Sequence, residues 1–576
     1  MTKGCLAAFG LGLLLVPCPL HSALPPWKED SAATWFQEHP DPQGWPAAAA
    51  SLKQSLAEAH ALKGPDVFTQ DETFSHWLSH LCWINAGLGS EQVRNEPKLL
   101  KAFVELGSKP ALSHEWVRAL TPYDKPYPSL AILLALHLAN PADLEEFPTL
   151  GVAYAVVFDQ PFPKRWPHPQ VDPDDIPKDK SNFVERFSDL VRAERNGDLD
   201  LDPRKLSVNE LRFVVDTEVS LDELAWARKH VRLSRSKFDE AFSSIRYTTP
   251  RLLSGEFTWQ LGPYTLEAIQ KNGGICVDQA YFASTAGKAH GLPTLFFHGQ
   301  GQGGGHAWFG YMERPGKWNT DCGRYASQNY PVGQAVNPQT WQPINDSELD
   351  WMVADLPKNP AYLPARTALT WARINRSNSP DEFLKAVREA RNLLPAWPDP
   401  WIEEAALLKD APAAGRKEFY ALWVQNFDKQ TDLKVTGQQQ LLEILKKEND
   451  PAAAELQKEI VRENRKKRFD LGIGAGAGVI FEKIDAGDWE AAEGEYKSLI
   501  RKFDDKGGGN LFYQVVQPYV VSCIEDAQWK RAESALEYAE RKMKVDNQGI
   551  LGREFSGLRL RIKNKEQPPS ANPGGL

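Results

Sequence analysis

A glycine pair followed by a cysteine and an alanine-rich stretch constrains the fold of this chain more than any other feature. Gly273 and Gly274 suit a tight turn, and the residues from Cys276 to Ala286 have the composition of a helix. A cysteine in the first turn of a helix lies at the positive end of the helix dipole, which lowers the pKa of its thiol. We therefore expect a reactive thiol at Cys276.

Strand candidates follow this helix closely. After a break at residues 291–293, the segment from Thr294 to His298 is rich in β-branched and aromatic residues. Residues 306–312 are a second candidate, and the segment that begins at Lys317 is a third. The stretch from Gly299 to Gly305 contains only glycine and glutamine, so we expect a flexible turn or loop there. The pattern predicts a helix packed on an antiparallel sheet.

Three residues in this region have the types and the order of a catalytic triad. His306 lies 30 residues after Cys276, and Asp321 lies 15 residues after His306. A thiol nucleophile needs a base, and a neutral imidazole needs an acceptor for its second nitrogen. We expect Cys276 to be the nucleophile, His306 the general base and acid, and Asp321 the residue that orients the imidazole. Taken singly, each also has a structural interpretation, as a small buried residue, a core histidine or a turn former.

The same region resembles the transglutaminase-like superfamily of papain-type cysteine enzymes. The resemblance covers residues 236–345. It rests on a Gly-x-Cys-x-Asp-x-Ala helix start, a Gly-Leu-Pro break, a His-Ala-Trp strand start and a tryptophan three residues before an aspartate, that is, on Gly274, Cys276, Asp278, Ala280, Gly291, Leu292, Pro293, His306, Ala307, Trp308, Trp318 and Asp321. The resemblance implies an α+β domain, with the nucleophile helix on an antiparallel sheet. It also implies the same three catalytic roles.

An acyl-transfer site also needs hydrogen-bond donors for the developing oxyanion and a surface for the substrate. The backbone N–H of Cys276 is the default donor. Gln270 is a side-chain candidate, because it precedes the cysteine by six residues, as the oxyanion glutamine does in papain-like proteases. A polar residue at a helix end is an equally good interpretation of Gln270. Trp259, Tyr264 and Trp308 are candidate substrate-binding residues, and the sequence does not choose among them.

The remainder of the chain is mainly helical by its apolar periodicity. We divide the 576 residues into a signal peptide (1–23), an N-terminal helical region (24–235), the catalytic domain (236–345) and a C-terminal region of helical-hairpin repeats (346–576). In the last region, Trp489 and Trp529 begin similar segments 40 residues apart, which loosely resemble tetratricopeptide repeats. Such repeats suggest a protein partner.

The first residues have the layout of a secretory signal peptide. Lys3 precedes an apolar run from Leu6 to Pro17, and the small residues at 21–23 suit cleavage. The run is too short for a membrane anchor, and Pro17 disfavours lipid attachment at Cys18. We expect an exported protein, periplasmic or extracellular, without a transmembrane segment.

Charge and cysteine spacing argue against other classes of protein. The net charge of −9 gives no reason to expect nucleic acid binding. The four cysteines outside the signal peptide form neither a disulfide framework nor a zinc pattern. Asp198, Asp200 and Asp202 alternate as in a calcium loop, but Pro203 replaces the required glycine, so a solvated turn is favoured. The glycines from 472 to 478 follow no strand, and close helix packing explains them better than a phosphate loop. We expect no metal and no cofactor.

We interpret the chain as an exported cysteine enzyme that forms a thioester at Cys276 from a peptide or protein amide. Water as the acceptor would make it an amidase or peptidase, and an amine would make it a cross-linking acyltransferase. The alternative is a catalytically silent scaffold whose helical repeats bind a protein partner. A mobile glycine-rich loop before His306 would favour this alternative, because it would misplace the base.

Overall fold

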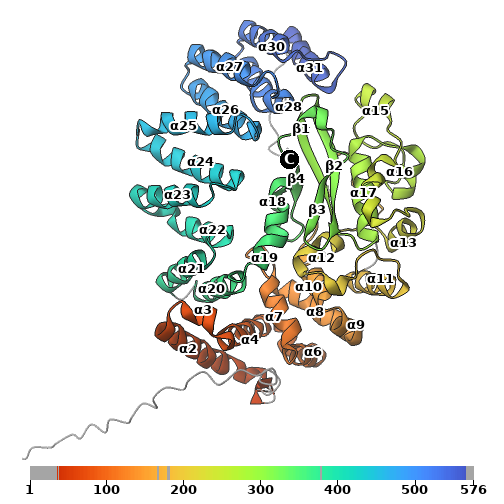
Figure 1. The fold of residues 1–576 in the computed structure, drawn as a ribbon, viewed down its shortest axis with the longest axis vertical. Coiled ribbons are helices and arrows are strands. Elements are labelled where there is room, and N and C mark those ends of the chain that lie inside the picture. Colours follow the sequence, from red (N-terminus) through yellow and green to blue (C-terminus); the bar gives the residue numbers. More distant parts are fainter. Residues whose placement is uncertain are drawn as a thin grey trace, which may run out of the picture.

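The structure is a computed structural model, and it describes residues 35–36, 38–39, 41–164, 166, 168–177, 182–376 and 379–565. The predicted signal peptide, with Cys18 and the cleavage site, lies outside these residues. The described chain has an α+β fold, in which one antiparallel sheet of five strands is surrounded by helices (Figure 1). None of the described helices is both long and apolar enough to cross a membrane.

The described elements that precede the sheet in the chain are all helices. Many of them start with proline, which suits the first turn because its nitrogen needs no partner there. They are α2 (Trp45–Lys63), α3 (Asp66–Gln70), α4 (Glu72–Gly89), α5 (Glu91–Asn95), α6 (Pro97–Gly107), α7 (Pro110–Ala119), α8 (Pro126–Ala139), α9 (Pro141–Glu146), α10 (Pro148–Val157), α11 (Phe183–Asn196), α12 (Val208–Val215), α13 (Leu221–His230), α14 (Glu240–Ser243), α15 (Thr249–Ser254), α16 (Leu266–Asn272) and α17 (Cys276–Ala289).

The sheet follows α17 directly. Its strands are β1 (Thr294–Gly301), β2 (Gly304–Arg314), β3 (Lys317–Cys322), β4 (Gln334–Val336) and β5 (Pro343–Asn345), in the order β3-β2-β1-β4-β5. The three predicted strands are confirmed as β1, β2 and β3. The prediction did not include β4 and β5. Helix α17 packs against β1 and β2, so its first residue lies close to the strand that carries His306.

The turn or loop predicted from Gly299 to Gly305 is present but is much shorter than predicted. Strands β1 and β2 continue through this segment and leave only Gln302 and Gly303 as the turn. The hairpin tip is held from outside the sheet. Asn510 Nδ2 donates a hydrogen bond of 2.8 Å to the carbonyl of Gln300, which orders a segment that glycine alone would leave loose.

The C-terminal region curves from the N-terminal helices past the sheet to the tip of the β1–β2 hairpin (Figure 1). Its helices are α18 (Asp346–Asp350), α19 (Leu356–Lys358), α20 (Tyr362–Asn375), α21 (Pro380–Leu393), α22 (Pro398–Leu407), α23 (Ala413–Asn426), α24 (Thr431–Lys447), α25 (Ala452–Glu463), α26 (Phe469–Asp485), α27 (Trp489–Phe503), α28 (Gly508–Leu511), α29 (Gln517–Glu525), α30 (Trp529–Met543) and α31 (Ile550–Asn564). The repeated tryptophans begin α27 and α30, as predicted.

The glycine-rich segment near residue 476 lies inside α26 and not in a loop. A Cβ atom at Gly476 would lie 2.4 Å from Leu499 Cδ1 on the neighbouring helix α27. The absence of a side chain therefore allows the two helices to approach each other closely, and this confirms the helix-packing interpretation.

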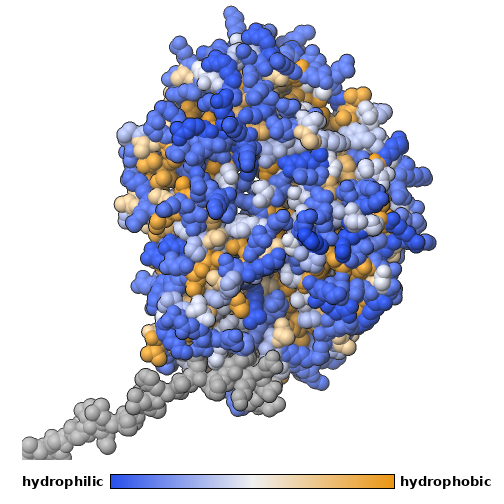
Figure 2. Space-filling view, in the orientation of Figure 1, coloured by the Kyte–Doolittle hydropathy of each residue, from blue (hydrophilic) through white to orange (hydrophobic). Residues whose placement is uncertain are grey.

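The buried apolar residues form two large clusters. One is continuous from Trp35 to Trp397 and includes both the N-terminal helices and the sheet. The other lies between Val435 and Ile562, and a small aromatic cluster around Trp423 lies between them in sequence. On the outside, hydrophilic residues cover most of the face drawn in Figure 2, and apolar residues are scattered.

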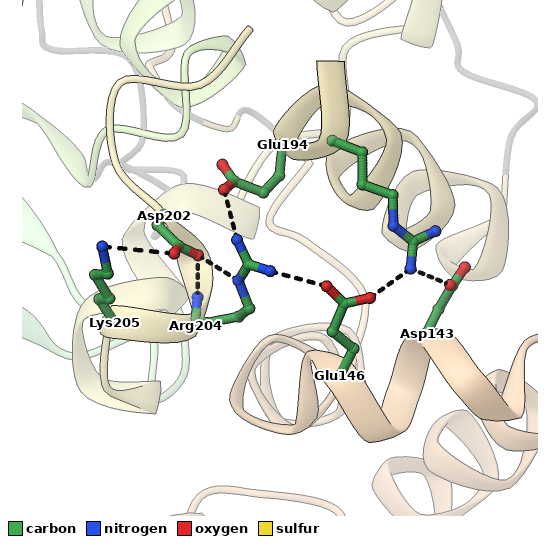
Figure 3. Close-up of polar contacts among 7 residues, drawn as sticks. Asp143, Glu146, Glu194, Asp202, Arg204 and Lys205 are labelled. Atoms are coloured by element: carbon green, nitrogen blue, oxygen red, sulfur yellow. Dashed lines mark hydrogen bonds and ion pairs between the residues drawn. The ribbon is translucent and has the colours of Figure 1, made fainter. Parts of the chain in front are cut away.

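Asp202, the last of the three aspartates that resemble a calcium loop, lies in a turn rich in ion pairs. Asp202 accepts a hydrogen bond of 2.8 Å from Arg204 Nε, and Arg204 also pairs with Glu146 and Glu194 (Figure 3). These carboxylates are bound to a guanidinium and do not converge on an empty centre. In the described parts of the chain, no three His, Cys, Asp or Glu side chains are grouped so that they could hold a metal ion.

Candidate functional site

The turn before Cys276 needs both of its glycines. Gly273 has a φ of 77°, a conformation that glycine adopts at little cost, and a Cβ atom there would lie 2.4 Å from the carbonyl oxygen of Arg246. At Gly274 a Cβ atom would lie 2.4 Å from Cβ of Asp278. The predicted tight turn is confirmed, and it places Cys276 at the first position of α17.

Asp278 ties the start of α17 to its surroundings. Its carboxylate is fully buried and accepts hydrogen bonds from the backbone N–H of Ile275 (2.8 Å), from Arg251 Nη1 (2.6 Å) and from the hydroxyl of Tyr264 (3.1 Å). Burial raises the pKa of Asp278, and the charge of Arg251 opposes that rise. The residue therefore fixes the helix start that carries Cys276.

The thiol of Cys276 is only partly exposed. Burial raises its pKa, and hydrogen bonds from the backbone N–H groups of Ala307, Val277 and Cys276 itself oppose the rise without cancelling it. The N–H groups of the helix terminus therefore lower the thiol pKa as predicted, but the predicted net lowering is wrong, because the cost of placing a thiolate in this partly enclosed position is larger. At neutral pH the resting group is a thiol.

His306 is held by a backbone carbonyl. Its Nε2 lies 2.8 Å from the carbonyl oxygen of Gly323, and since a carbonyl can only accept, Nε2 carries the proton. This leaves Nδ1 as the unprotonated nitrogen, the form that a general base requires. Burial lowers the imidazole pKa to about 4, so the ring is neutral near pH 7.

Cys276 and His306 share neighbours. The N–H group beside the sulfur belongs to Ala307, the next residue after His306 in β2. Tyr325 stacks on the imidazole with 4.3 Å between ring centroids, and Tyr330 stacks at 5.5 Å. Both phenols also lie near enough to the sulfur for a thiolate to raise their pKa. The structure thus brings Cys276 and His306 into one site, although no hydrogen bond joins their side chains in the described chain.

Asp321 does not contact His306. Its side chain is 66% exposed and pairs with Arg324 Nη1 at 2.8 Å. Arg324 also pairs with Asp346 and donates a hydrogen bond of 2.7 Å to the carbonyl of Tyr330. The orienting role predicted for Asp321 is instead filled by the Gly323 carbonyl, while the Asp321 carboxylate pairs with Arg324.

The other predicted site residues lie apart from the sulfur or beneath the site. Gln270 is exposed near the end of α16 and makes no hydrogen bond to a described residue. Trp259 and Tyr264 are fully buried and pack edge to face, with 5.2 Å between ring centroids, and Tyr264 hydrogen-bonds to Asp278. Trp308 is also fully buried, with its ring centroid 5.9 Å from that of His306. The three aromatic residues are therefore buried and are not exposed to a substrate in this structure.

Sequence reasoning missed the tyrosines, Arg251 and the Gly323 carbonyl. An acidic residue at the third position of a helix is a known capping signal, and it could have identified Asp278 as a cap. Nothing in the sequence indicates a backbone carbonyl. Comparisons with protein-family models, with curated proteins and with solved structures found no match for this chain.

Proposed function

We propose that this protein is an exported cysteine enzyme with a transglutaminase-like catalytic domain, which transfers the acyl group of a peptide or protein amide. One observation carries the proposal. Cys276 begins a helix beside the strand of His306, whose imidazole is neutral and has Nδ1 free to accept a proton. A thiol and an unprotonated imidazole in one site are the two groups that nucleophilic acyl transfer needs.

The reaction would begin with neutral partners. As the sulfur of Cys276 attacks the amide carbonyl carbon, the thiol proton passes to Nδ1 of His306, which becomes an imidazolium. The C–N bond then breaks, the imidazolium proton goes to the leaving amine, and a thioester remains. Water or a second amine attacks the thioester carbon and gives its proton to Nδ1. The C–S bond breaks, the acid or new amide leaves, and the proton returns to the sulfur.

The backbone near the sulfur offers donors for the oxyanion. The N–H groups of Cys276, Val277 and Ala307 already hydrogen-bond to the sulfur. A tetrahedral intermediate on this sulfur would place its oxygen near the same groups, and such donors contribute a large part of the stabilisation in acyl transfer. Gln270 is not needed for this role.

A second candidate function is a silent scaffold whose C-terminal helices bind a protein. The raised thiol pKa and the absence of a hydrogen bond between Cys276 and His306 among the described residues favour it. The two candidates differ in whether a thioester forms, so one experiment separates them.

The test is to trap the acyl-enzyme. A panel of glutamine-containing peptides would be incubated with the protein at pH 7, quenched in acid and analysed by peptide mass spectrometry. We expect an acyl group on the peptide that carries Cys276, and none in Cys276→Ala or His306→Ala. Cys82→Ser is the matched control, because that thiol is also partly buried and burial raises its pKa to about 12.

Iodoacetamide labelling gives an independent readout that needs no substrate. Cys276 should react faster than Cys82, and the loss of the base in His306→Ala should slow it at least tenfold. Equal labelling rates in both proteins, together with no acyl group on Cys276, would reject the enzyme and leave the scaffold.

A further inference from the structure

A cavity lies where the N-terminal helices, the sheet and the C-terminal helices meet. Its volume is about 680 Å³. Its walls come from the segment after α7, from α12, from the β4–β5 connection and from α20, α22 and α24. Neither Cys276 nor His306 lines it, and the proposed acyl transfer does not use it.

One face of α20 supplies polar groups to this cavity. Tyr362, Arg366, Thr370 and Arg373 line it, and their spacing of three or four residues places them on the same side of the helix. Arg212 approaches from α12. Three guanidinium groups from two regions of the chain therefore converge on one space.

These arginines are incompletely paired. Arg212 is only 7% exposed, and its Nε has no hydrogen-bond partner among the described residues, although Nη1 donates to Gln339 Oε1 at 3.1 Å. Nη2 of Arg373 is also buried and has no partner in the part of the chain that the structure describes, while its Nε donates to Glu403 at 3.2 Å. Buried donors without a partner are costly, and burial lowers the pKa of Arg212 to about 10. The cavity therefore offers unused N–H groups to an acceptor.

The acids around the cavity do not supply that acceptor. Glu403 is already shared between Arg373 and Arg376. Asp399 lies near the arginines, but among the described residues no ion pair within 4.0 Å joins them. Glu348 lies at the edge, and burial raises its pKa to about 7, which leaves it partly protonated at neutral pH. The side chains around the cavity therefore have more positive than negative charge.

Apolar side chains complete the wall. Trp351, Met352, Trp397 and Leu433 all line the same space. A ligand that fits must therefore combine an acceptor group with a body that apolar surfaces can hold, as small-molecule sites commonly do.

We propose that this cavity binds a small molecule in which a carboxylate or phosphate group is joined to an apolar body. The anionic group would accept hydrogen bonds from Arg212, Arg366 and Arg373, since guanidinium forks match the geometry of both anions. The apolar body would lie against Trp351 and Trp397. The bound molecule would join the three regions of the chain at their meeting point.

The test uses the full mature chain and four simple probes. Hexanoate and hexyl phosphate carry both features, inorganic phosphate carries only the anion, and hexanol carries only the apolar body. Thermal shift at constant ionic strength and titration calorimetry would measure binding. We expect saturable stabilisation by one or both amphiphiles, and at least tenfold weaker binding of inorganic phosphate and of hexanol. The stronger amphiphile identifies the anionic group.

Arg366→Gln is the informative variant, because this side chain makes one hydrogen bond, of 3.2 Å to the hydroxyl of Tyr362, among the described residues. Losing one charged donor should weaken binding about 10- to 100-fold. Arg388→Gln, on α21 and paired with Glu404, is the control and should bind like the wild type. The melting temperature of each unliganded variant checks that it folds, and Arg373→Gln provides a second variant.

Two results would overturn the proposal. One is the lack of saturable stabilisation by either amphiphile above the ionic-strength control. The other is equal binding to wild type and to a folded Arg366→Gln protein, because the anion would then be bound elsewhere.

Discussion

At the scale of single residues, the state of the imidazole decides what the site can do. The carbonyl of Gly323 fixes the proton on Nε2 of His306 without adding a negative charge. A carboxylate in that position would favour the imidazolium and raise its pKa. With a carbonyl, the ring stays neutral well below pH 7, and the base is ready over a wide pH range.

The first prediction separates Asp321 from His306. Asp321→Asn should retain catalytic efficiency within about threefold, because the side chain is exposed and bonds only to Arg324 among the described residues. His306→Gln should reduce catalytic efficiency at least 100-fold, because a general base usually contributes at least that much. Steady-state kinetics on the peptide found by acyl-enzyme trapping would measure both. A loss of catalytic efficiency of about 10⁴-fold in Asp321→Asn, as substitution of a triad aspartate can cause, would show that the carboxylate reaches the imidazole during turnover.

The second prediction concerns the pH profile of the same enzyme. Since burial lowers the pKa of His306 to about 4, kcat/KM should fall only below about pH 4 to 5. An imidazole at its ordinary pKa would lose activity near pH 6.5. Initial rates between pH 3.5 and 8, with stability checked at each pH, would show the position of the acid limb. A limb near pH 6.5 would mean that the ring is solvated or paired with a carboxylate.

A third prediction concerns a buried acid that supports the helix before Cys276. Glu223 accepts a hydrogen bond of 2.8 Å from the backbone N–H of Leu266, at the start of α16. Burial raises its pKa to about 7, so the folded state binds the proton more tightly than the unfolded state. The contribution of Glu223 to the free energy of unfolding should therefore be greatest below about pH 4.5. It should decrease by about 3 kcal/mol as the pH rises to about 7.

Glu223→Gln keeps an acceptor for Leu266 and removes the charge. Its free energy of unfolding, from urea titrations, should exceed that of the wild type at pH 8, and the difference should shrink by about 3 kcal/mol at pH 4.5. Glu313→Gln, at a partly exposed position in β2, is the control. A pH-independent difference for Glu223→Gln would contradict the buried ionisation.

Some of these residue-scale features can be predicted from the sequence. The sequence predicts Cys276 and His306 as site residues, because the glycine turn, the helix and the strand that carry them have clear sequence patterns. Gly323 acts through its carbonyl, which every residue has, so no side-chain type reveals it. Tyr325 and Tyr330 lie near the sulfur and stack on His306, but they belong to an irregular segment whose path no periodic pattern fixes.

At the scale of elements, the β1–β2 hairpin links the C-terminal helices to the candidate site. Its turn donates two hydrogen bonds to Gln328, from Gln302 N to the carbonyl (2.8 Å) and from Gly303 N to Oε1 (2.7 Å). Gln328 lies between Tyr325 and Tyr330, which stack on His306. Helix α28 holds the hairpin and therefore holds the tyrosine segment indirectly.

A fourth prediction tests this link with one methyl group. Gly508 has a φ of 41°, and a Cβ atom there would lie 2.4 Å from the Cα atom of Gln302. Because that atom is backbone, Gly508→Ala must move the hairpin or α28. We expect catalytic efficiency to fall about 10- to 100-fold, as for small displacements in other active sites, with Cys276 still present and the protein folded.

Gly494→Ala is the matched control for Gly508→Ala. It lies in α27, a Cβ atom there meets nothing within 4 Å, and alanine should stabilise the helix by up to about 1 kcal/mol. Its activity should be unchanged. Wild-type activity in Gly508→Ala would show that the hairpin tip does not position the site.

The elements themselves were predicted unevenly. Long helices and β1 to β3 have apolar patterns that their burial requires, so their existence could be read directly. Strands β4 and β5 have three residues each, too few for a pattern. The sequence does not indicate how far β1 and β2 extend into the glycine-rich tip, because the tip is ordered by Asn510. That residue lies more than 200 residues later in the sequence, at a contact that local patterns do not contain.

At the scale of the whole molecule, the apolar clusters indicate two units of stability. The N-terminal helices share one core with the sheet as far as Trp397, and the helices after Val435 have their own. The direct bonds between the parts are few and polar, among them Asn510 to Gln300 and Arg553 to the carbonyl of Leu252 at 2.6 Å. Hydrogen bonds of this kind contribute about 1 kcal/mol each, far less than a core.

The fifth prediction follows from this division. Leu133 of α8 and Leu536 of α30 are both almost completely buried, one in each core. Leucine to alanine in such positions costs about 2 to 5 kcal/mol. In scanning calorimetry we expect two overlapping unfolding transitions. Leu133→Ala should lower the temperature of one transition, and Leu536→Ala should lower the temperature of the other. A single transition whose temperature both variants lower equally would mean that the polar bonds at the hairpin couple the cores into a single cooperative unit. The Gly508→Ala variant distinguishes these cases further. Alanine is strained at this positive φ, so in a divided molecule it should lower the transition temperature of the core that contains α28 and leave that of the other core close to the wild-type value.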